Sequence, residues 1–312
     1  MNKSRKNILL KGSILLGVLV VFAFLLYQSS DTQRVKALNL NSPTSNKFEM
    51  VKKWIPDNTD FLVVSDIVRL KNIPSLMNFF EQSLFKGTDT TIEAISELLG
   101  KKSILSMLVM SANFKEDGSS FLFNVIAQGD FHKNNFISYI KDELSKKKIS
   151  LLSEDIVGVK VYYQKDETND DPFAFALPDG IHLIVGTKKS LNELLNTGRG
   201  TLPVTSANFA FFGYLRSSPV INKILPPQIA MFEMANFYSD DNAIIHFTVM
   251  LPDSVQANNL QVFLQGMKAL YILQAEGNKA LIESMDSILV TVNDRQAFVD
   301  APFELLLKIT AR

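Results

Sequence analysis

A repeated pattern of strands and helices constrains this chain more than any other feature of its sequence. Segments 112–140 and 235–264 follow the same order of residue types, at an offset of 123 residues that becomes 124 after one extra turn residue. In each copy the residues ANF end an apolar run, and an acidic turn follows, KEDGSS or YSDDNA. Apolar residues then alternate, as at Phe121, Phe123 and Val125. Alternation at a period of two is typical of a strand with one buried face, so the pattern predicts the same β-hairpin twice.

The similarity extends to both sides of the predicted hairpins. Upstream, segments 60–82 and 208–225 each read as a strand, a proline and a helix, and downstream, 175–195 and 290–309 each read as a hairpin and a short helix. Apolar residues at three- and four-residue spacing after each central hairpin predict a helix that packs on a sheet. In the second copy these residues are Leu260, Phe263, Leu264 and Met267. We therefore expect an internal duplication of class α+β, with two ferredoxin-like (split βαβ) halves.

The amino-terminal segment has the composition of a membrane anchor. The first 30 residues contain four basic residues and no acidic one, and segment 8–27 is almost entirely apolar over 20 residues. About 20 apolar residues span a bilayer as a helix, and flanking basic residues stay in the cytoplasm. A cleaved signal peptide is the alternative, although Tyr27 and Gln28 do not suit the −3 position of a cleavage site. The sequence thus predicts a signal-anchor in the inner (cytoplasmic) membrane, with the carboxyl-terminal domain periplasmic or otherwise extracytoplasmic.

These patterns divide the chain into four parts. Residues 1–30 form a cytoplasmic tip and transmembrane anchor, 31–50 a polar linker, 51–200 a first α+β domain and 201–312 a second one. The break between the halves lies near residues 197–206, TGRGTLPVTS, which are rich in turn formers.

Charge and cysteine content exclude several functions. The chain has 32 basic and 32 acidic residues, and without the four basic residues at the amino terminus 28 basic residues remain, a formal charge of −4. Nucleic-acid binding needs a concentrated basic surface, so we expect no nucleic-acid partner. The chain contains no cysteine, which excludes disulfides, thiolate metal sites and cysteine catalysis.

Residues 55–67 combine a turn-forming segment with a short apolar strand. A proline and acidic residues precede a strand that ends in Ser65-Asp66-Ile67, and a later strand leads to a hairpin and a short helix over 191–195. Over about residues 55–215 this pattern resembles membrane-anchored bacterial envelope proteins of the uncharacterised DUF3352 type. The pattern holds no catalytic motif, so the resemblance implies an envelope location and nothing more specific.

The sequence contains no recognisable catalytic, cofactor-binding or metal-binding motif. His132, His182 and His246 lie far apart in the sequence without a ligand-spaced carboxylate, which favours structural roles. Asp66 stands at a strand end before a loop, where functional residues often occur, although no partner for it is evident. Replacement of Asp66, His132 or His246 by alanine is expected to cost about 1 kcal/mol or less, as surface changes do.

Phenylalanine is frequent in the chain and gathers at the start of the second half. Phe209, Phe211 and Phe212 are expected to pack in the core, with an apolar groove between the halves as the alternative. Together with Asp66, these phenylalanines are the candidate residues of a functional loop or groove.

The absence of a catalytic motif favours a non-enzymatic, membrane-anchored envelope protein whose duplicated ectodomain binds another protein or supports an assembly. One alternative is a binding protein for a hydrophobic ligand or lipid in the cleft between the halves, and a second is an enzyme with an unrecognised site. An apolar patch with a polar rim would favour the scaffold, an enclosed apolar pocket the ligand-binding protein, and a cleft with a histidine–carboxylate contact the enzyme.

Overall fold

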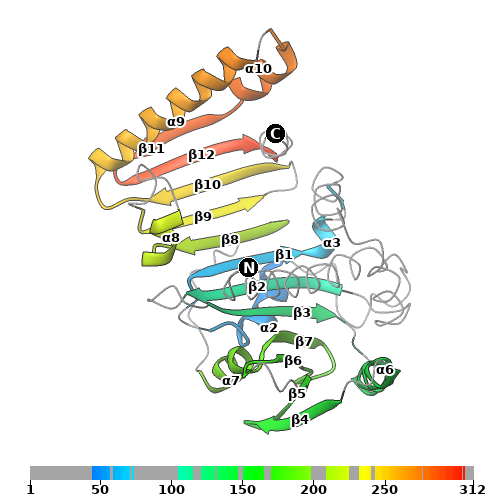
Figure 1. The fold of residues 1–312 in the computed structure, drawn as a ribbon. Coiled ribbons are helices and arrows are strands. Elements are labelled where there is room, and N and C mark those ends of the chain that lie inside the picture. Colours follow the sequence, from blue (N-terminus) through cyan, green and yellow to red (C-terminus); the bar gives the residue numbers. More distant parts are fainter. Residues whose placement is uncertain are drawn as a thin grey trace, which may run out of the picture.

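A single antiparallel sheet forms the centre of the protein in the computed structural model (Figure 1). The sheet has 12 strands in the order β11-β12-β10-β9-β8-β1-β2-β3-β7-β6-β5-β4. The structure describes residues 44–56, 59–70, 72–73, 105–114, 121–129, 131, 133–146, 150–164, 170–197, 209–224, 232–239, 243–275, 277–303 and 305.

The first half of the chain supplies one side of the sheet, with helices at its faces and its end. Its strands are β1 (Phe61–Asp66), β2 (Leu105–Phe114), β3 (Phe121–Gly129), β4 (Leu151–Ile156), β5 (Val159–Gln164), β6 (Phe173–Ala176) and β7 (His182–Thr187). Its described helices are α2 (Thr44–Lys52), α3 (Ile67–Leu70), α6 (Lys133–Lys146) and α7 (Lys188–Asn196).

The second half supplies the other side. Its strands are β8 (Phe211–Arg216), β9 (Met234–Ser239), β10 (Ile244–Met250), β11 (Leu289–Asn293) and β12 (Gln296–Pro302). Its described helices are α8 (Pro219–Ile224), α9 (Ser254–Gln274) and α10 (Lys279–Asp286).

The two halves repeat one strand order. The order β1-β2-β3-β7-β6 in the first half corresponds to β8-β9-β10-β12-β11 in the second, and the hairpin of β4 and β5 is an addition to the first half. The halves meet at the centre of the sheet, where β1 and β8 pair antiparallel and Val64 lies opposite Phe212. The internal repeat is therefore visible in the topology as well as in the sequence.

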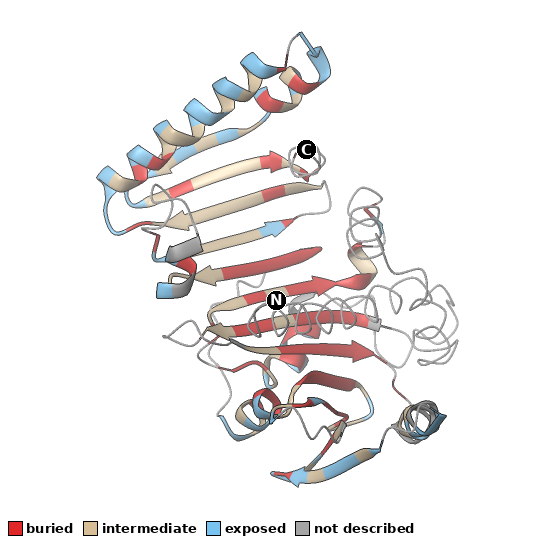
Figure 2. Ribbon diagram, viewed as in Figure 1, coloured by how far each residue is buried: buried red, intermediate tan, exposed pale blue. Residues whose placement is uncertain are grey.

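Apolar clusters lie on both faces of the sheet. Neighbouring residues of a strand point to opposite faces, and accordingly Val125 belongs to one cluster and Ile126 to the other. Helices α2 and α7 cover the Ile126 face, while α9 packs on the opposite face over β11 and β12. Figure 2 shows that burial is greatest in β8, β1, β2, β3 and β7 and weaker from β9 to β12.

The predicted pair of ferredoxin-like halves is wrong. A split βαβ unit contains parallel strands joined by a crossover helix, whereas β1 and β2 are antiparallel neighbours from Phe61 opposite Ala112 to Asp66 opposite Met107. One core cluster also contains residues of both halves, such as Leu183 and Ile245, so the halves share a core within one sheet.

The prediction of a transmembrane, signal-anchor protein is also corrected. No helix in the described part of the chain is long and apolar enough to cross a membrane. Segment 8–27, on which that prediction was based, lies outside the described residues, as does most of the predicted break at 197–206. Residues 44–50, predicted as linker, belong to α2, because Phe48 of that helix packs into the core. The extracytoplasmic location inferred from the sequence stays a prediction.

Candidate functional site

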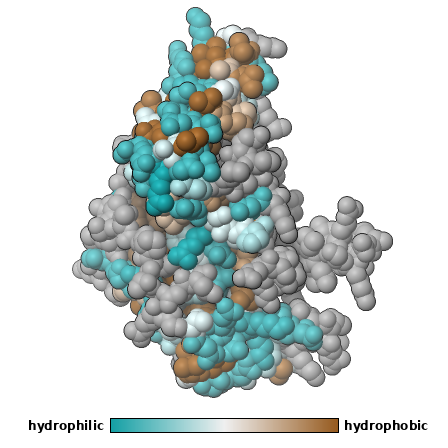
Figure 3. Space-filling model, turned by 90° about the vertical axis from the view of Figure 1, so that its left-hand side faces the viewer, coloured by the Kyte–Doolittle hydropathy of each residue, from teal (hydrophilic) through white to brown (hydrophobic). Residues whose placement is uncertain are grey.

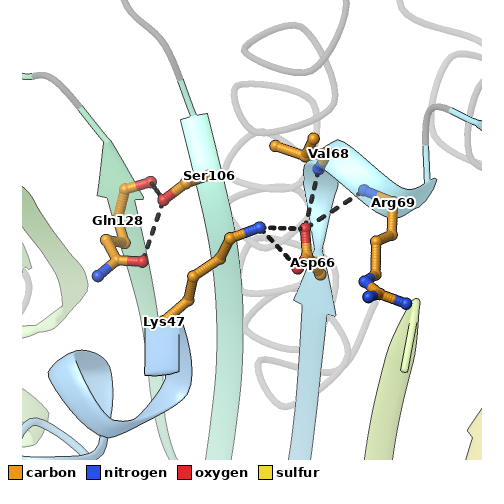
Figure 4. A network of polar contacts seen from close by, with 6 residues as sticks. All are labelled: Lys47, Asp66, Val68, Arg69, Ser106 and Gln128. Atoms are coloured by element: carbon orange, nitrogen blue, oxygen red, sulfur yellow. Dashed lines mark hydrogen bonds and ion pairs between the residues drawn. The ribbon is translucent and has the colours of Figure 1, made fainter. Parts of the chain in front are cut away.

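Asp66 is a buried structural residue in this fold. Its carboxylate accepts hydrogen bonds from Lys47 Nζ on α2 at 2.8 and 3.0 Å (Figure 4). The backbone N–H groups of Val68 and Arg69 donate to the same carboxylate at 3.1 and 3.3 Å, so Asp66 also caps α3. Asp66 is 0% and Lys47 1% exposed. The ion pair therefore joins α2 to the end of β1, and the expectation of a surface residue is wrong.

A row of buried polar side chains continues from Asp66 across the neighbouring strands. The Ser106 hydroxyl on β2 donates to Gln128 Oε1 on β3 at 3.0 Å, as Figure 4 shows. Gln128 in turn lies directly opposite His182 on β7. All three side chains are at most 1% exposed. The row is thus closed to any substrate, which argues for a structural role.

His182 forms the one buried histidine–carboxylate contact that the structure describes. Its Nδ1 lies 2.8 and 2.9 Å from the carboxylate oxygens of Asp179, which also accepts from the backbone N–H of Ile181. Burial opposes ionisation of Asp179, but the hydrogen bond and charge of His182 outweigh it and lower the carboxyl pKa to about 2. The rings of His182 and Trp54 lie 6.1 Å apart between their centroids. The Nε2 atom of His182 is buried and has no hydrogen-bond partner among the described residues.

The histidine of this pair is closed to solvent in the structure. A general base must reach the proton that it removes, whereas the His182 side chain is only 1% exposed. Asp179 instead holds the turn between β6 and β7 and anchors Lys53 from the region after α2, at 3.5 Å. The His182–Asp179 pair thus fixes a turn and a ring position.

A second histidine–carboxylate pair lies on the second half-sheet. His246 Nδ1 is 2.8 Å from Asp300 Oδ1, and the ring of Tyr238 stacks on His246 with centroids 4.5 Å apart. The three residues are direct cross-strand neighbours on β9, β10 and β12. The side chains of His246 and Asp300 are 24% and 43% exposed, so this pair meets solvent.

The three phenylalanines predicted for a core or groove are core residues. Phe209, Phe211 and Phe212 are 1%, 8% and 5% exposed. Phe209 and Phe212 pack on the face that α2 covers, and Phe211 packs on the other face. Tyr214, two residues further along β8, is also buried, donates to the carbonyl of Thr59 at 3.1 Å, and has its pKa raised to about 12 by burial. These side chains build the junction of the halves.

Helix α9 has apolar residues on two opposite sides. Ala257 and Leu260 are buried against Ala297, while Phe263 and Leu264 are partly buried in the same cluster. On the outer side, four aliphatic residues remain exposed: Val255 at 66%, Val262 at 68%, Leu270 at 53% and Leu273 at 76%.

Exposed apolar residues and Gly266 on the outer side of α9 form what we call the outer stripe, which the polar residue Asn259 interrupts between Val255 and Val262. Val255, Val262, Gly266, Leu270 and Leu273 follow one another at spacings of three, four and seven residues, which place side chains on one side of a helix. From Val255 to Leu273 the stripe is about 27 Å long at 1.5 Å per residue. Figure 3 shows separate hydrophobic patches, with hydrophilic residues between them, over the upper part of the molecule, where α9 and α10 lie in Figure 1. The residues predicted to pack on the sheet were Leu260, Phe263, Leu264 and Met267, and none of them belongs to the outer stripe.

No group of three or more histidine, cysteine or acidic residues within the described ranges is placed to hold a metal ion. His132, the third histidine, lies outside them. Comparison with known proteins found no matching family model, no matching curated protein and no matching solved structure, so the DUF3352-type resemblance stays a prediction.

Proposed function

We propose that this protein is a non-enzymatic scaffold that binds another protein through the outer stripe of α9. The observation that carries the proposal is the exposure of Val262, Leu270 and their neighbours on a helix that is already packed on the sheet by its other side. A helix that is apolar all round is typical of a buried position, so its outer side is suited to a partner.

The outer stripe has a useful but limited binding energy. Fully burying a valine or leucine side chain contributes roughly 1.5–3 kcal/mol. Because the four aliphatic side chains are between 53% and 76% exposed, covering them would contribute on the order of 4–8 kcal/mol before the costs of association. Polar residues such as Asn258 and Gln265 border the stripe and form the polar rim of an interaction surface.

The alternatives have weaker support. A ligand in a cleft between the halves needs a separation there, but β1 and β8 pair directly from Phe61 to Ser65. An enzyme needs a reachable base, and His246 with Asp300 is the one half-exposed histidine–carboxylate pair in the described structure. That pair lies on the strands of an antiparallel sheet as a cross-strand contact, which accounts for its geometry without a reaction.

A photo-reactive amino acid at Val262 of the full chain tests the proposal in cells that express the protein. We expect a crosslink to a protein at Val262, a clear loss of it after Leu270→Glu, and little at Asn196, an exposed control position on α7. Absence of any protein adduct at Val262, or equal yields at Val262 and Asn196, would overturn the proposal.

A further inference from the structure

We infer that Gln128, His182 and Trp54 bind internal water between the first half of the sheet and the segment that follows α2. The inference is independent of the proposed function and of the outer stripe. It rests on three buried polar atoms, on the placement of their side chains beside one another, and on the donors and acceptors that they present.

Three side chains in this region each have a buried polar atom without a hydrogen-bond partner among the described residues. The atoms are Gln128 Nε2, His182 Nε2 and Trp54 Nε1. Gln128 and His182 are 0% and 1% exposed, so bulk solvent does not reach their side chains. Buried polar groups are nearly always hydrogen-bonded to protein or to ordered water, so three such atoms in one region indicate a bound ligand.

Two of these side chains form a close cross-strand pair. Gln128 on β3 lies directly opposite His182 on β7, on the same face of the sheet. In the neighbouring pair, the N–H of Gly129 donates to the carbonyl of Ile181 at 2.8 Å. The pair of Gln128 and His182 is therefore of the non-hydrogen-bonded kind, in which side chains approach each other most closely.

The orientation of Gln128 and the position of Trp54 complete the site. In Figure 4 the amide nitrogen of Gln128 points away from Ser106 on β2. The strand on the other side of β3 is β7, which carries His182. The Trp54 ring lies 6.1 Å from the His182 ring between centroids. His182 thus has Gln128 beside it within the sheet and Trp54 beside it from the segment after α2.

Hydrogen bonds at Asp179 determine the role of His182 Nε2. Asp179 accepts from the backbone N–H groups of Ile181 and His182 at 3.0 and 2.7 Å, and its pKa of about 2 keeps it ionised at neutral pH. An ionised carboxylate only accepts, so His182 Nδ1 donates to it and Nε2 is an acceptor in the neutral ring. Trp54 Nε1 and Gln128 Nε2 are donors. The three atoms are therefore two donors and one acceptor.

Water is the ligand that matches this set. A water molecule both accepts and donates hydrogen bonds, and internal water typically makes about three of them. A cation is disfavoured by the two donors, and an anion by the acceptor on His182. A rotation of the Gln128 amide by 180° would replace a donor with an acceptor, and water fits that set as well.

This water would hold the segment after α2 against the sheet. At the other end of α2, Lys47 is bound to Asp66 of β1. Asp66 and Gln128 both pair with Met107 of β2, one from each side, so the ion pair and the water site lie along one row of the sheet. Polar contacts would thus fix α2 near both of its ends.

Nuclear magnetic resonance of the full chain tests the inference through Trp54, because the sequence contains one tryptophan. With isotope-labelled nitrogen in the indole and histidine rings, the Trp54 indole proton should give an Overhauser cross-peak to a long-lived water. The Nε2 resonance of His182, identified by its loss in His182→Gln, should be that of an unprotonated nitrogen at neutral pH. Gln128→Leu removes the amide and should weaken the water cross-peak several-fold. Asn196→Leu, the matched control on α7, should leave it unchanged.

Several results would overturn the inference. An indole proton of Trp54 that is protected from solvent exchange and has no cross-peak to water would show a dry site. Rapid exchange of this proton would show that Nε1 reaches bulk solvent. An undiminished cross-peak in folded Gln128→Leu would place the water away from Gln128, and if that variant does not fold, the spectra of the unmodified chain decide. A protonated His182 Nε2 would remove the acceptor, and a shift of the indole resonance with added sodium chloride would then assign the site to a small anion.

Discussion

Removal of the Asp66 carboxylate should destabilise the protein far more than a surface substitution does. Asp66→Ala leaves the Lys47 ammonium, 1% exposed, without the carboxylate oxygens that lie 2.8 and 3.0 Å away. It also removes the side-chain acceptor of the Val68 and Arg69 N–H groups. Loss of one member of a buried ion pair costs about 3–5 kcal/mol, and loss of a helix cap about 1 kcal/mol. Since both effects use one side chain and are not additive, we expect a total of about 3–5 kcal/mol.

Urea unfolding followed by far-ultraviolet circular dichroism measures this cost in a double-mutant cycle. Lys47→Met alone leaves a buried carboxylate and should also be strongly destabilising, because it separates the same pair. The double variant removes both charges, so its loss should be smaller than the sum of the two single losses by about 2 kcal/mol or more. Asp155→Ala is the matched control, because Asp155 is an exposed carboxylate that also caps a turn, at 2.9 Å from Gly158 N.

Two results would refute this reasoning. A cost of about 1 kcal/mol or less for Asp66→Ala, similar to Asp155→Ala, would show that the carboxylate is solvated and that α2 does not pack over the end of β1. Strict additivity of Asp66→Ala and Lys47→Met would show that the cap on α3, and not the ion pair, is the source of the stability.

The remaining predictions concern pH and the junction of the halves. The folded-state pKa of Asp179 is lowered from 3.8 to about 2, so its ionised form stabilises the fold above pH 4 and this contribution is lost as the pH falls toward 2. Asp179→Asn should remove about 1 kcal/mol of that pH dependence, after allowance for solvent exposure, in thermal unfolding at pH 2–4; an unchanged pH profile would contradict the pairing with His182. Gly213→Ala on β8 should lower the free energy of unfolding in urea by about 1–3 kcal/mol, because the added Cβ would overlap the Phe237 ring and lie 2.7 Å from the carbonyl oxygen of Leu62 on β1. Gly180→Ala is the control and should be nearly neutral, because a Cβ there would meet nothing within 4 Å. Equal stability of the two glycine variants would argue against the close pairing of β1 and β8.

The alternating pattern predicted the repeated hairpins, but not their register. Phe121 pairs with Phe114 at the end of the first hairpin, and Ile245 pairs with Ser239 at the end of the second. The repeated ANF motif suggested that Tyr238 and Ser239 begin the turn, whereas both belong to β9. Alternation shows which side chains share a face of the sheet. A shift of two residues in the pairing of two strands keeps every side chain on its face, so the pattern does not tell whether Phe237 or Ser239 pairs with Ile245.

The sequence of the two strands that join the halves indicates that both are central strands of a sheet. Segment 61–65, FLVVS, and segment 209–212, FAFF, are short continuous apolar runs rather than alternating ones. Such runs indicate strands covered on both faces, which lie in the middle of a sheet. Two such strands can lie in two separate sheets or side by side in one sheet, and the periodicity of the sequence is the same in both cases. The core cluster around Phe211, which both halves share, depends on contacts between residues far apart in the sequence.

The apolar residues of the outer stripe of α9 also follow a helical spacing in the sequence. Whether they are buried depends on whether another layer packs against that side of the helix. Leu260 and Phe263 predicted the sheet-facing side correctly, and Val262 and Leu270 are equally apolar at the same helical spacing. A second apolar side predicts burial of the whole helix, so the sequence alone favours a position between two layers. The structure supplies one of these layers, the β11–β12 side of the sheet. Val262 and Leu270 therefore lie on the side of α9 where the proposed partner would complete the core.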